Sequence, residues 1–164
     1  FGTNVNDLKP IIDSKASDSA ALDSTIELLV KANRSLPMAK IITIPEAWAH
    51  RRDFPKKLKD LYAYGGAVME PWDGPAAICG AYGEWAIAGM DRNGLRPFRY
   101  SVTTDGLIVM SSETGVLELD SEKIKTRGRL QPGKMMIVDP HKKRIIFAEE
   151  RNKEAATTCQ RREW

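Results

Sequence analysis

Three short segments of the sequence combine residues that fix backbone shape with residues that carry charge. Residues 70–75 (Glu-Pro-Trp-Asp-Gly-Pro) contain two carboxylates, an indole, two prolines and a glycine. Residues 91–97 contain an Asn-Gly pair, which tolerates positive φ, and two arginines that can clamp carboxylates or carbonyls with paired hydrogen bonds. Residues 129–133 end in Pro-Gly. Each segment alone is compatible with a structural corner, so any chemistry depends on their combination.

Charged side chains in and near these segments are interpreted as structural. Arg92 and Arg96 are expected to pin a loop to neighbouring carboxylates, and Asp73 and Glu113 are candidate partners. A carboxylate also occurs at Asp18, within a Ser-Asp-Ser run of helix-capping residues. A capping residue of this kind stabilises a helix by about 1 kcal/mol.

Cysteine and histidine do not form a metal-binding pattern. Cys79 and Cys159 form no CxxC pair, and His50 and His141 lie far apart. Cys79 lies in an apolar stretch, so we interpret it as a small buried hydrophobic residue and not as a nucleophile. We therefore expect no metal site in this sequence.

The elements that position these segments change from helices to strands along the chain. A helix is expected from Ser17, with Leu22, Ile26, Leu29 and Val30 on one face. Two more helices are expected at residues 37–42 and 55–69, the second weakened by two glycines. Three antiparallel hairpins follow, with strands at 76–80 and 85–90, 98–103 and 107–111, and 134–139 and 144–148. The pattern predicts an α+β domain, helices first and hairpins after.

Composition narrows the function classes further. The 164 residues carry a formal net charge of +3 with mixed signs, which is not the concentrated basic face of a nucleic-acid-binding protein. No apolar run approaches the roughly 18 residues of a membrane span, and the first residues do not resemble a signal peptide. We expect no nucleic-acid or membrane partner and an intracellular, cytoplasmic location.

The order of the motifs resembles the glutaminase domain of glutamate synthase, a class II (N-terminal nucleophile) glutamine amidotransferase. The resemblance covers residues 1–148, as the C-terminal part of that domain, and leaves 149–164 as an unmatched polar tail. It implies that this α+β unit is part of a four-layer αββα sandwich. The motifs that carry it are residues 17–20, 34–37, 44–48, 69–75, 91–97, 112–113 and 128–133.

The resemblance implies a function for one residue of this sequence. In the family, an N-terminal cysteine attacks the side-chain amide of glutamine, and an aspartate at the position of Asp18 binds the α-ammonium group. Because residue 1 is Phe, we expect the nucleophile and the oxyanion residues to lie upstream, so the isolated chain should not hydrolyse glutamine. The parent would pass ammonia to 2-oxoglutarate to form glutamate.

The same resemblance implies cofactors and partners outside this segment. The parent would use FMN, an iron–sulfur cluster and either NAD(P)H or ferredoxin, none of which has a motif here. Its partners would be glutamine and the remaining domains of glutamate synthase. Two alternatives remain open: a non-catalytic module that kept the fold for binding, and part of another class II amidotransferase.

Overall fold

The computed structural model describes residues 6–52 and 54–147, as three α-helices followed by seven strands. The helices are α1 (Asp18–Lys31), α2 (Leu36–Thr43) and α3 (Lys56–Val68). The strands are β1 (Ala77–Tyr82), β2 (Trp85–Met90), β3 (Arg99–Thr103), β4 (Ile108–Ser111), β5 (Ile124–Arg129), β6 (Met135–Asp139) and β7 (Arg144–Phe147), with a short 3₁₀-helix, η2 (Ser121–Lys123), before β5.

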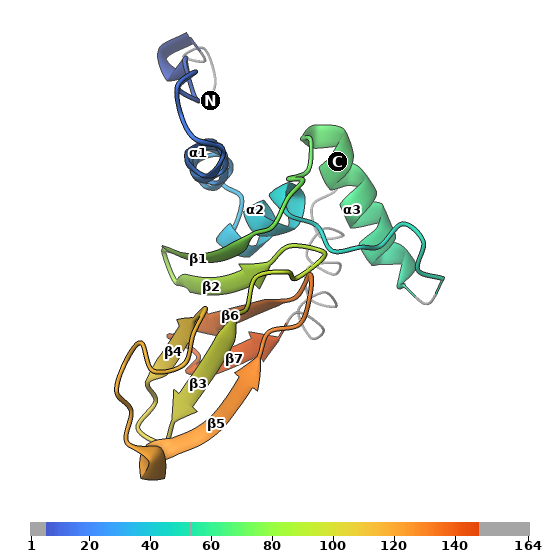
Figure 1. Cartoon of the computed structure of the whole chain (residues 1–164). Coiled ribbons are helices and arrows are strands. Elements are labelled where there is room, and N and C mark those ends of the chain that lie inside the picture. Colours follow the sequence, from blue (N-terminus) through green and yellow to red (C-terminus); the bar gives the residue numbers. More distant parts are fainter. Residues whose placement is uncertain (1–5, 53, 148–164) are drawn as a thin grey trace.

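The strands form two antiparallel sheets that stack on each other. The larger sheet has the order β1-β2-β6-β7, and the smaller sheet has the order β4-β3-β5. The helices lie on one side of the larger sheet, and the smaller sheet lies on its other side (Figure 1). The described residues therefore form three layers, helices on sheet on sheet.

Each interface between layers has its own hydrophobic core. Residues of all three helices pack against Ile87, Met135 and Ile137 of the larger sheet. On the opposite face of that sheet, Ala88 and Met136 belong to a second cluster, which includes residues of the smaller sheet. This alternation follows from the two-residue period of a strand, which points successive side chains to opposite faces.

Local sequence explains the helices. The Ser17 hydroxyl accepts a hydrogen bond from the Ala20 N–H, and Pro37 lies in the first turn of α2, where a missing N–H has no consequence. Gly65 lies inside α3, where a Cβ would sit 3.5 Å from the Cα of Ile42. This is an ordinary van der Waals distance, so α3 packs directly against α2 here, and Gly65 retains the low helix propensity of glycine.

The α+β class, the three helices and the three hairpins are confirmed. One strand, β5, was not predicted, and it pairs with β3 in the smaller sheet. The interpretation of 149–164 as a tail outside the core concerns residues outside the described part of the structure. No helix in the described residues is long and apolar enough to cross a membrane.

Candidate functional site

Asp18 lies at the mouth of a pocket of about 310 Å³ between α1 and the segment that follows α3. Because Ser17 caps the helix, Asp18 is its first residue and its carboxylate is not the cap. The prediction of Asp18 as a capping residue is therefore wrong by one position. Asp18 is exposed, and a carboxylate in the first turn also interacts favourably with the helix dipole.

The opposite wall of this pocket is formed by residues 70–73, which are fixed to the end of α2. The Trp72 N–H donates to the Thr43 carbonyl at 2.7 Å, and the Trp72 indole N–H donates to the Gly74 carbonyl at 3.1 Å. Gly74 has a φ of 143°, a conformation that side chains rarely adopt. The Glu-Pro-Trp-Asp-Gly-Pro motif is thus a rigid bend that brings Glu70 and Asp73 to the pocket of Asp18.

A second motif holds this bend from the other side. The Arg92 guanidinium donates to the Asp73 carboxylate at 2.8 Å, so Asp73, one of the two candidate carboxylates, is the partner of Arg92. Arg92 belongs to the loop that follows β2, so the ion pair joins the two segments that first suggested function. The pair is solvent-exposed on both sides, which makes it a positioning contact more than a source of stability.

The loop after β2 is organised by the buried carboxylate of Asp91. One oxygen accepts the N–H groups of Asn93 (2.7 Å) and Gly94 (3.0 Å), and the other accepts the N–H of Ala76 (2.9 Å). Burial raises the pKa of Asp91, but these three backbone donors outweigh it, so the pKa lies below its usual value. Asp91 therefore stays ionised and ties the start of the first hairpin to its end.

The third motif, residues 131–133, packs against the same loop without space for extra atoms. A Cβ at Gly94 would lie 2.7 Å from Pro132, and a Cβ at Gly133 would lie 2.7 Å from Glu46. The Gly133 N–H donates to the Asp91 carbonyl at 2.7 Å. The three motifs, residues 70–75, 91–97 and 129–133, are therefore loops that contact one another.

Buried charges lie beneath these loops. Lys40 is 2% exposed, and its ammonium donates to the Gly133 carbonyl at 3.4 Å. Burial lowers the pKa of Lys40 to about 8, against the opposing effect of the negative charges of Glu46 and Asp91. Gly89 makes room for this side chain, because a Cβ there would lie 2.9 Å from Cε of Lys40.

Glu46 is the acceptor at the centre of this charged cluster. Its carboxylate accepts hydrogen bonds from the Tyr62 hydroxyl at 3.1 Å and the Lys134 ammonium at 3.3 Å, and Arg51 lies 3.9 Å away. Burial and the Glu46 charge both raise the pKa of Tyr62, which keeps the phenol neutral. This cluster was not predicted from the sequence, although Lys40, a lysine among the apolar residues of α2, could have indicated a buried charge.

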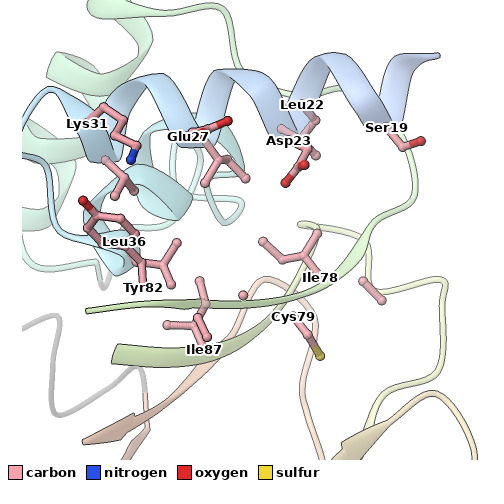
Figure 2. Close-up of a pocket in the computed structure, with 15 residues that line it drawn as sticks. Ser19, Leu22, Asp23, Glu27, Lys31, Leu36, Ile78, Cys79, Tyr82 and Ile87 are labelled. Carbon is pink, nitrogen blue, oxygen red and sulfur yellow. The ribbon is translucent and has the colours of Figure 1, made fainter. Parts of the chain in front are cut away.

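A second, larger cleft of about 590 Å³ lies between α1 and β1. Leu22, Leu36 and Ile78 line it, and Asp23 and Glu27 of α1 lie at its side (Figure 2). The Lys31 ammonium lies 5.9 Å from the centre of the Tyr82 ring at one end. The lining is mainly apolar, with acidic groups on the helix.

Cys79 differs from its predicted environment. It is exposed, and in Figure 2 its thiol points away from α1 while Ile78 points toward it. The interpretation of Cys79 as a buried residue is therefore wrong, because neither hydrophobic core includes it. Partial desolvation still raises the pKa of the thiol, which disfavours the nucleophilic thiolate.

Comparison with known proteins identifies the family. The model for class-II glutamine amidotransferases matches residues 1–164, including 149–164, which the sequence analysis set apart. The chain belongs to the class-II glutamine amidotransferase family. Residues 17–20, which include Asp18, and residues 91–97, which include Asp91, are two of the seven segments that carry the resemblance to glutamate synthase.

The relatives are much longer proteins. The chain is 49% identical over 139 residues to the glutamate synthase [NADPH] large chain of Azospirillum brasilense, a match that covers 85% of this chain and 9% of that protein. The corresponding Bacillus subtilis protein is 41% identical over 164 residues, which is 100% of this chain and 11% of that protein. A chloroplastic ferredoxin-dependent glutamate synthase 2 of Arabidopsis thaliana is 44% identical over 138 residues, which is 82% of this chain and 8% of that protein. The chain thus spans about a tenth of the length of these curated relatives.

Proposed function

We propose that this chain is the part of a glutamate synthase glutaminase domain that holds the α-ammonium group of glutamine through Asp18. The observation that supports the proposal is the exposed Asp18 carboxylate at a pocket of about 310 Å³, next to the bend 70–73. An ionised carboxylate forms charge-assisted hydrogen bonds with an ammonium group. Because Ser17 caps the helix, Asp18 has both oxygens available for such a contact.

The parent polypeptide would then hydrolyse glutamine to glutamate and ammonia, and the ammonia would react with 2-oxoglutarate. The nucleophile and the oxyanion donors would come from outside this chain, and Cys79 does not replace the nucleophile. The same proposal places the protein in the cytoplasm or a plastid. It also implies that the fourth layer of the αββα sandwich, the second layer of helices, lies outside the described residues.

The iron–sulfur cluster implied for the parent does not fit the residues that the structure describes. No group of three or more His, Cys, Asp or Glu side chains within the described ranges could hold a metal ion, and Cys79 is the one cysteine among them. An iron–sulfur cluster requires several cysteine thiolates. We therefore place the iron–sulfur cluster in another part of the parent, and we propose the same place for FMN and the electron donor.

The experiment compares Asp18→Asn with Asp60→Asn, an exposed aspartate on α3, in the complete parent polypeptide. Loss of a charged hydrogen bond of about 1.5–3 kcal/mol predicts a KM for glutamine raised roughly 10- to 100-fold, with a smaller change in kcat. Glutaramate, which lacks the α-ammonium group, separates the roles: Asp18→Asn should abolish the preference for glutamine over glutaramate. An unchanged preference would refute the role of Asp18.

A further inference from the structure

Three arginines lie on the face of the smaller sheet that points away from the core. Arg99 on β3 is the cross-strand partner of Arg129 on β5, and Ser101 is the partner of Arg127. Directly opposed residues of antiparallel strands share a face, and residues two apart along a strand also share it. Arg99, Arg127 and Arg129 therefore form one group, the arginine face.

The opposite face confirms this orientation. Tyr100 is the partner of Gly128, and its ring lies over Gly128 so closely that no Cβ fits there. Tyr100 packs against the second core cluster, which lies between the two sheets. The arginine face is thus the outer surface of the molecule, and no α-helix of the described residues covers it (Figure 1).

The charges on this face are unfavourable in the chain alone. Like charges directly opposite each other on paired strands destabilise a sheet, and Arg99 and Arg129 are such a pair. Within residues 6–52 and 54–147, none of the three arginines forms an ion pair with a carboxylate. All three are exposed.

A cleft and two apolar side chains lie beside the arginines. The cleft, of about 370 Å³, has Arg99, Arg127 and Val109 in its lining, and the loop 113–119, which carries Glu113 and Glu118, forms its other wall. In this loop, Val116 is 61% exposed and Leu117 is 50% exposed. Guanidinium groups beside exposed apolar side chains are typical of a protein interface, where arginine and apolar contacts supply most of the binding energy.

We propose that the arginine face and the loop 113–119 bind an acidic, partly apolar protein surface in the rest of the parent polypeptide. Carboxylates of that surface pair with the guanidinium forks, and its apolar side chains cover Val116 and Leu117. The inference rests on the proposed function, since the parent is about ten times longer than this chain. A small anion would satisfy the arginines but would leave the apolar loop exposed.

The first test labels arginines with p-hydroxyphenylglyoxal in the complete parent polypeptide and locates the products by mass spectrometry. The reagent should modify Arg99, Arg127 and Arg129 at least tenfold more slowly in the folded parent than in the same polypeptide unfolded in urea. Equal rates in the two states would refute the interface. If inorganic phosphate protects the three arginines in a parent that otherwise leaves them reactive, the face is a small-anion site and the proposal is wrong.

The second test uses the opposite effects of one substitution in two contexts. Arg129→Glu places a carboxylate opposite Arg99, so it should raise the melting temperature of the isolated 164-residue chain by about 2–4 °C. In the parent it faces acidic groups and should lower the melting temperature, whereas Arg52→Glu, on the loop before α3, is the matched charge reversal and should lower it less. A shift of the same sign in both contexts would contradict the interface.

These measurements do not depend on glutamine. Protected arginines in a parent that does not hydrolyse glutamine would refute only the proposed function. Reactive arginines in a parent that hydrolyses glutamine would refute only the interface.

Discussion

Arg92 and Asp73 join two loops that are 19 positions apart in the sequence, with Nη2 and Oδ1 2.8 Å apart. Asp73 belongs to the bend that lines the pocket of Asp18, and Arg92 belongs to the loop fixed by Asp91. The pair therefore connects a surface feature, the pocket, to a buried one. Its geometry is that of a charge-assisted hydrogen bond.

Breaking this pair should loosen the bend without unfolding the chain. Asp73→Ala and Arg92→Ala should each reduce the free energy of unfolding by less than about 1 kcal/mol, because both side chains are exposed. Amide hydrogen exchange at Trp72, whose N–H is bonded to Thr43, should nevertheless accelerate. The exchanged pair Asp73→Arg with Arg92→Asp should restore slow exchange, and its failure to do so would show that the ion pair does not fix the bend.

Two glycines with nearly the same backbone conformation should respond differently to alanine. Gly94 (φ 61°) would place a Cβ 2.7 Å from Pro132, whereas Gly83 (φ 56°) has no atom within 4 Å of that position. Gly83→Ala should cost about 1 kcal/mol for the left-handed conformation alone. Gly94→Ala should cost roughly 2–4 kcal/mol, because the overlap adds overpacking. Urea unfolding of both variants measures the difference, and equal losses would disprove the close packing of the loops.

The buried carboxylate of Asp91 should make the fold sensitive to acid. Its pKa in the folded chain lies below that of the unfolded chain, so its contribution is present above about pH 4 and is lost as the pH falls through the folded value. In the Asp91→Asn variant, the side-chain NH₂ group would face a backbone N–H donor. The substitution should therefore lower the free energy of unfolding by about 2 kcal/mol or more at pH 7. The difference in unfolding free energy between wild type and variant should shrink between pH 5 and pH 3. A pH-independent difference would contradict this role.

The parts of the fold that local sequence determines were predictable. Ser17 marks the start of α1, and residues such as Gly83 and Gly106 mark hairpin turns at which only positive φ is suitable. The sequence offered Asp73 and Glu113 as candidate partners of Arg92 and Arg96, and the structure pairs Arg92 with Asp73. These signals act over a few residues, or within motifs whose composition is unusual.

The parts that depend on distant contacts were not predictable. β5 (Ile124–Arg129) has no apolar alternation, and its conformation depends on pairing with β3 and on Gly128 beneath the ring of Tyr100. Cys79 was predicted to be buried because its neighbours in sequence are apolar, yet its exposure depends on which distant residues pack on β1, and neither core includes it. The burial of Lys40 likewise depends on Gly89, which is far from it in the sequence.

Lys40 should be a net destabilising charge whose effect disappears at high pH. Its pKa is about 8 in the folded chain against 10.5 ordinarily, so the unfolded chain binds more protons between these values and stability from this group rises with pH. Lys40→Met keeps the stem and removes the charge, so it should raise the free energy of unfolding by about 1–3 kcal/mol at pH 7. This advantage should shrink by pH 9.5, as measured by urea unfolding at both values, with Lys59→Met as the control on α3. A variant less stable than wild type at pH 7 would show instead that the ammonium is needed to hold the Gly133 loop.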